Sequence, residues 1–134
     1  MAGAAELLYG CHSALELFFG SLMVLRGRGS MDPVEGSTAR ARLYRRWHGC
    51  GLVALSSLGI LILLKGKVHE EATSCISAAL TIFHGGCVAV HALAATESAA
   101  APKSLGGVAW KEAALSPHIP LTIGFAAHAA GMLP

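Results

Sequence analysis

Histidines are the residues of this chain best suited to chemistry. Six of the seven fall inside or at the edge of long apolar stretches: His12, His48, His84, His91, His118 and His128. A neutral imidazole nitrogen can ligate haem iron or a transition metal. These six histidines are therefore candidate cofactor ligands, and haem or chlorophyll is the candidate cofactor.

Glu16 is the other unusual polar residue, because it lies within the first apolar stretch. An ionisable side chain inside a bilayer costs about 2.5–3.5 kcal/mol on insertion scales, which makes it a functional candidate by default. His12 lies four residues earlier and so shares its helix face. Glu16 and His12 are a candidate proton- or ion-handling pair, and we expect Glu16 to hydrogen-bond a histidine or a hydroxyl across a helix interface.

The third apolar stretch has one polar stripe at helical spacing, formed by Ser77, Thr81, His84, Cys87 and His91. We expect this stripe to face the inside of a bundle or a subunit interface. A helix rise of about 1.5 Å per residue predicts that the polar residues lie at two depths in the membrane. His48, His91 and His118 are expected near one interface, and His12, Glu16, His84 and His128 deeper. The alternative to a cofactor is that each histidine only hydrogen-bonds a neighbouring helix, which contributes about 0.6 kcal/mol.

Four apolar stretches must position these residues, at about 4–25, 47–64, 73–95 and 116–133. Each is long enough, as a helix, to cross a hydrocarbon core about 30 Å thick. Charged residues make up 13% of the chain, against about 25% in soluble domains. The sequence therefore predicts an all-α integral membrane protein. We expect one domain, 1–134, folded as an up-down bundle of four transmembrane helices with short loops.

Two helix starts are predicted in more detail. Ser116 is a good N-cap and Pro117 suits the first helical position, so we expect the fourth helix to start there. Residues 37–46 have no helix breaker and should extend the second helix out of the bilayer as an amphipathic segment. Glycine, alanine and serine are frequent in the third and fourth stretches, which predicts that these two helices form the tightly packed interior pair or an interface to another subunit.

Charge predicts the orientation. Eight of the ten Lys and Arg residues fall in two loops, 26–46 and 96–115, and the other two are Lys65 and Lys67. The positive-inside rule puts both basic loops on the cytoplasmic, matrix or stromal side and both termini opposite. Within the first loop, four arginines are expected to meet anionic lipid headgroups: Arg40, Arg42, Arg45 and Arg46.

No metalloprotease, serine-hydrolase or phosphate-binding motif occurs in the sequence, so we expect no catalytic activity of its own. Neither nucleic acid nor a soluble substrate is an expected partner. The arrangement of apolar stretches resembles small four-helix anchor or accessory subunits of energy-transducing membrane complexes. The resulting expectation is an accessory subunit that packs against other membrane subunits. Two alternatives are a haem- or chlorophyll-binding electron-transfer or pigment protein, and a small transporter or proton-handling protein centred on Glu16.

Overall fold

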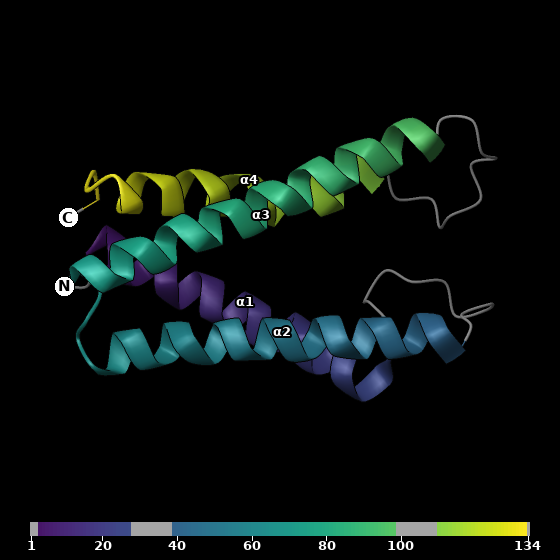
Figure 1. The fold of residues 1–134 in the computed structure, drawn as a ribbon, viewed down its shortest axis with the longest axis horizontal. Helices are drawn as coiled ribbons and strands as arrows, with labels where there is room; N and C mark the ends of the chain where they lie inside the picture. Colours follow the sequence, from purple (N-terminus) through teal and green to yellow (C-terminus); the bar gives the residue numbers. More distant parts are fainter. Residues whose placement is uncertain (1–2, 28–38, 99–109, 134) are drawn as a thin grey trace. The chain divides into compact units, whose positions relative to one another are not determined.

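A computed structural model of the chain describes residues 3–27, 39–98 and 110–133; within these ranges the side chains of 40–41, 90–98 and 110–116 are left out of the description. Four helices account for the regular structure of the described residues: α1 (Ala4–Arg26), α2 (Ala39–Leu64), α3 (Glu71–Ser98) and α4 (Trp110–Ala129) (Figure 1). The prediction of an all-helical chain is therefore confirmed.

Three helical segments of the described chain are long and apolar enough to cross a membrane: Ala4–Arg26, Arg42–Leu64 and Glu71–Ala89. Helix α4 is shorter, with 20 residues. A membrane location is thus compatible with the first three helices, and the crossing by α4 stays a prediction.

The helices belong to two compact units. One unit is Tyr9–Lys67, which contains α2 and most of α1. The other consists of Gly3–Leu8 together with Val68–Pro134, and so contains the first turn of α1 with α3 and α4.

In the unit Tyr9–Lys67, α1 and α2 run antiparallel with their backbones in close approach. A Cβ atom added to Gly20 would lie 2.9 Å from the backbone oxygen of Gly49, and one added to Gly49 would lie 2.7 Å from that of Gly20. Only glycine allows backbones this close, because any Cβ would force one helix to shift. This glycine contact fixes where α1 and α2 meet.

A buried hydrogen bond joins the same two helices farther along. The Ser56 hydroxyl of α2 donates to the backbone oxygen of Ser13 on α1 at 2.7 Å. Gly59 faces the Ser13 side chain so closely that a Cβ there would overlap the hydroxyl. The interface between the two helices thus includes glycines and a polar contact as well as apolar side chains such as Leu52.

In the other unit, α3 and α4 also lie side by side and antiparallel (Figure 1). Ser77 near the start of α3 meets His128 near the end of α4, and His84 farther along α3 meets His118 nearer the start of α4. The first turn of α1 joins this unit through Leu8, whose side chain covers Gly124 of α4. Polar side chains therefore form part of this contact, together with apolar ones such as Leu8.

The predicted start of α4 at Ser116 is wrong, because the helix begins at Trp110. Pro117 and Pro120 therefore lie inside the helix. The preceding residues 111–115, Lys-Glu-Ala-Ala-Leu, are strong helix formers, and their propensity extends the helix toward the N-terminus. Helices in apolar surroundings tolerate proline where neighbouring groups satisfy the freed backbone. Ser116 therefore lies inside the helix and is not its N-cap.

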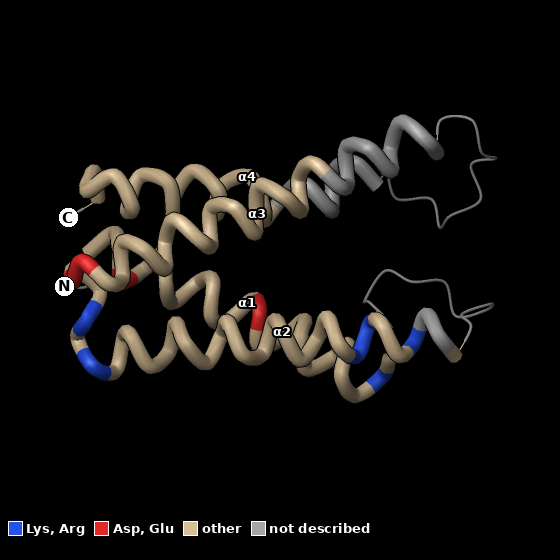
Figure 2. Tube along the Cα trace, viewed as in Figure 1, with Lys and Arg blue, Asp and Glu red and all other residues tan. Residues whose placement is uncertain are grey.

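Several polar side chains are buried beside the apolar core, and many large apolar side chains are exposed. His12, Ser56, Ser77, His84 and His128 are all buried. Large apolar side chains are exposed on every helix; they include Leu7, Phe18, Leu61, Ile82 and Ile123. Lys and Arg of the unit Tyr9–Lys67 gather at the two ends of its helices (Figure 2).

Candidate functional site

A histidine pair lies between α3 and α4. The Nδ1 atoms of His84 and His118 are 3.0 Å apart, and the two ring centroids are 5.3 Å apart at an interplanar angle of 35°. His84 is fully buried and His118 is half-buried. A hydrogen bond between two Nδ1 atoms requires that one ring carries its proton there and the other does not. If both rings are neutral, they therefore have complementary tautomers.

Two aromatic rings orient His84. The Phe125 ring of α4 stacks on the imidazole with a centroid distance of 5.9 Å and an interplanar angle of 4°. Phe83 meets it edge-on at 5.1 Å and 74°. The His84 ring is thus held by a stack and an edge contact as well as by its bond to His118.

A second polar contact between α3 and α4 lies closer to the start of α3. Ser77 Oγ and His128 Nδ1 are 2.8 Å apart and both residues are buried. The Thr81 hydroxyl donates to the Ser77 backbone oxygen at 2.8 Å, so this residue of the stripe bonds within α3. Ser77 and His84 confirm the prediction that the polar stripe of α3 faces inward, and Thr81 and Cys87 are half-buried.

The predicted sorting of histidines by depth is wrong for His84 and His118, which are direct neighbours. The error follows from the start of α4. Because α4 begins at Trp110, His118 lies about 12 Å along the helix axis from that end. This places it deeper than a helix beginning at Ser116 would.

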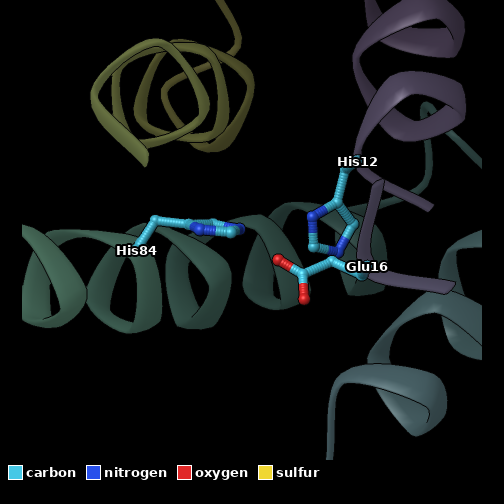
Figure 3. A group of neighbouring side chains, drawn as sticks. All are labelled: His12, Glu16 and His84. Atoms are coloured by element: carbon cyan, nitrogen blue, oxygen red, sulfur yellow. The ribbon is translucent and has the colours of Figure 1, made fainter. Parts of the chain in front are cut away.

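His12 and Glu16 lie on α1, in the unit Tyr9–Lys67, and both are buried. Figure 3 shows their side chains on one face of the helix, as their spacing predicts, and also draws His84 of α3. A carboxyl and an imidazole one turn apart can share or pass a proton. The candidate proton-handling pair is therefore present as two buried neighbours on α1.

The remaining predicted residues are more scattered. His48 is exposed on α2. Arg42 and Arg46 are exposed and Arg45 is half-buried, all near the start of α2. Arg40 of α2 and His91 of α3 have side chains outside the described part of the chain. Of the six candidate ligands, the described side chains bring His84 and His118 together.

The His84–His118 pair has nitrogen atoms that can ligate a metal or haem. Each ring has a second nitrogen, Nε2, in addition to the Nδ1 that joins the pair. Histidine ligands of metals and haem commonly use one nitrogen for the metal and bond a second group through the other. His84 and His118 could therefore serve as ligand and supporting partner, or simply as a polar bond between two helices.

Sequence reasoning missed two pairings. His69, the seventh histidine, lies 3.2 Å from Glu6 through its Nε2 atom, at the partly exposed start of α1. The contact between Gly20 of α1 and Gly49 of α2 was also not predicted from the sequence, although both glycines stand out within apolar stretches. Comparison of the chain with protein-family models, curated proteins and solved structures finds no match.

Proposed function

We propose that this chain is an integral membrane protein of four spans that serves as a structural subunit of a larger membrane complex. One observation carries the membrane assignment: the described helices expose leucine, isoleucine and phenylalanine while they bury histidine, serine and Glu16. A water-soluble protein this small needs a polar surface. In a bilayer, the same exposed side chains face lipid, and buried polar groups such as Ser77 and His128 bond one another.

The outer face of α3 supports the role as a subunit. Its exposed residues include Cys75, Ala78, Ala79, Gly86 and Ala89, so small side chains flank the exposed Ile82 on this face. Transmembrane helices associate through small residues that let backbones approach closely, because lipid provides no hydrophobic drive for association. A neighbouring subunit's helix fits such a face better than lipid chains do.

The experiment compares two exposed glycines with equal surroundings. A Cβ atom at Gly86 of α3 or at Gly51 of α2 would meet no atom within 4 Å. We expect Gly86→Leu to reduce the size of the assembly extracted from the native membrane in mild detergent, and Gly51→Leu to leave it unchanged. Native gel electrophoresis with an antibody to the chain measures this size.

Two results would contradict the proposal. Release of the parent chain from membranes by alkaline carbonate would remove the membrane assignment. An assembly no larger than a single chain in its micelle would remove the subunit role. Both measurements use the unmodified chain, so neither depends on whether a variant folds.

A second candidate function is binding of a haem or chlorophyll within the membrane. The buried His84–His118 pair favours it, because an imidazole supported by a second imidazole is a suitable axial ligand. The visible absorption spectrum of the protein purified from its native membrane tests this candidate directly.

A further inference from the structure

Two arginines of α2 pack against the end of α1. Helix α1 closes at Gly27, whose φ is +63° and whose N–H donates to the Met23 oxygen at 2.8 Å. A Cβ atom on Gly27 would lie 3.2 Å from Arg46 Nε and 3.3 Å from Arg42 Cβ. The C-terminal end of a helix carries partial negative charge, which favours cations there. Arg42 and Arg46 therefore lie at the C-terminal end of α1, where their positive charge is favourable.

Four arginines surround this end and form what we call the arginine collar: Arg26, Arg42, Arg45 and Arg46. Arg26, Arg42 and Arg46 are exposed. Residues 17–26 and 39–64 contain no Asp or Glu, so this part of the unit is strongly basic. Figure 2 shows the Lys and Arg bands at the ends of α1 and α2, with none along the middle of α2.

Two aromatic side chains lie beside the collar. Tyr44 and Trp47 are 58% and 63% exposed, and their rings meet edge-on with centroids 5.8 Å apart. Tyrosine and tryptophan are enriched at the boundary between headgroups and acyl chains. Trp47 follows the last arginine of the collar and begins the apolar part of α2, so it marks such a boundary.

The length of α2 places the second boundary. From Trp47 to Leu64 the helix rises about 26 Å, close to the hydrocarbon thickness of a bilayer. Leu58, Leu61 and Leu64 are exposed along this stretch. Lys65 and Lys67 follow at once and are exposed. The collar is therefore at headgroup level when the apolar stretch is in the membrane.

We propose that the arginine collar binds the phosphate groups of anionic phospholipids in the leaflet at its own end of α1 and α2. The guanidinium fork suits bidentate contact with phosphate, and the aromatic pair fixes its depth at the headgroups. The inference rests on the membrane location in the proposed function, but not on the role as a subunit. The inference predicts that the collar prefers anionic to zwitterionic lipid. If the arginines only set the orientation of the chain in the membrane, no such preference is required.

Trp47 reports on this lipid directly. Trp110 is the other tryptophan of the chain, so Trp110→Phe leaves Trp47 as the sole tryptophan, which is excited selectively over the two tyrosines. The protein is reconstituted in vesicles of phosphatidylcholine with a fixed fraction of brominated phosphatidylglycerol, or with the same fraction of brominated phosphatidylcholine. We expect stronger quenching of Trp47 by the brominated anionic lipid, and loss of the difference in high salt.

Matched variants assign the preference to the collar. Arg42→Gln with Arg46→Gln should lower the preference for phosphatidylglycerol by roughly fivefold per arginine. Arg42→Lys with Arg46→Lys keeps the charge without the guanidinium fork, and should give a preference between those of the parent and the glutamine variant. Lys65→Gln with Lys67→Gln removes the same charge at the opposite end of α2 and should leave Trp47 quenching unchanged.

The possible outcomes separate this inference from the proposed function. Failure of the parent chain to co-float with vesicles would overturn both. Co-floating with equal quenching by the two lipids, or equal preference after loss of Arg42 and Arg46, would overturn the collar alone. Inorganic phosphate that abolishes the preference, where sodium chloride of equal ionic strength does not, would identify a site for free phosphate and also overturn the inference.

Discussion

His84 Nδ1 and His118 Nδ1 lie 3.0 Å apart across the interface between α3 and α4. One hydrogen bond thus joins residues 34 positions apart in the sequence. The stacked Phe125 ring, 5.9 Å from His84, holds the geometry in place. Burial of a polar group without a partner is costly, so we expect this hydrogen bond to couple the two histidines energetically.

A double-mutant cycle measures this dependence. We expect His84→Phe and His118→Phe to be non-additive, with a coupling energy of about 0.6 kcal/mol and at most about 1.7 kcal/mol. Unfolding in mixed micelles of a mild detergent and dodecyl sulfate gives the free energies. Additivity to within about 0.3 kcal/mol would mean that the bond contributes nothing.

The glycine contact between α1 and α2 should be sensitive to a single methyl group. Gly20→Ala and Gly49→Ala place a Cβ 2.9 and 2.7 Å from the facing backbone oxygen. We expect each to lower the free energy of unfolding by about 1–3 kcal/mol. The control is Gly51→Ala on α2, which meets no atom within 4 Å. It should stabilise the protein by up to about 1 kcal/mol through helix propensity. Equal effects at all three positions would disprove the close approach.

Two neighbouring serines of α2 provide a matched pair. The buried Ser56 hydroxyl donates to Ser13 on α1, whereas the exposed Ser57 hydroxyl donates to Val53 within its own helix. Ser56→Ala should lower the free energy of unfolding by about 0.5–1.5 kcal/mol, because the interhelical bond is lost. Ser57→Ala should have little effect. A larger loss for Ser57→Ala would reverse the assignment of faces on α2.

Hydropathy was sufficient to predict four helices, because the apolar stretches are long and separated by charged segments. The α3 stripe was predictable from the 3–4 spacing of Ser77, Thr81 and His84. The His84–His118 contact was not, since the register of two helices depends on where each begins. A shift of the α4 start from Ser116 to Trp110 was enough to misplace His118.

The close contact between α1 and α2 was harder to predict. The many alanines and glycines of the third and fourth stretches predicted the packing of α3 with α4, which the structure shows, but not the close backbone approach of Gly20 and Gly49. One glycine on each helix is sufficient if the two face each other. Composition counts small residues but does not say which of them meet.

The visible spectrum separates the two candidate functions. The proposal of a structural subunit predicts that protein purified from its native membrane, with the His84–His118 pair intact, has no absorption band in the visible range. A band that disappears in His84→Phe, while Gly51→Ala keeps it, would favour the cofactor-binding candidate instead. Both variants leave the exposed apolar surface unchanged, so retention in the membrane is the control for folding.

Cysteine accessibility tests the central claim of the proposed function, that α4 crosses a membrane together with α1, α2 and α3. The four native cysteines are replaced by alanine, and single cysteines are introduced by Ser30→Cys, after α1, and by Met132→Cys, after α4. In sealed, uniformly oriented vesicles a membrane-impermeant maleimide should label one of these cysteines, and the other only after permeabilisation, because four spans put them on opposite sides. Labelling of both, or of neither, before permeabilisation would contradict the account, because residues 30 and 132 would then lie on the same side.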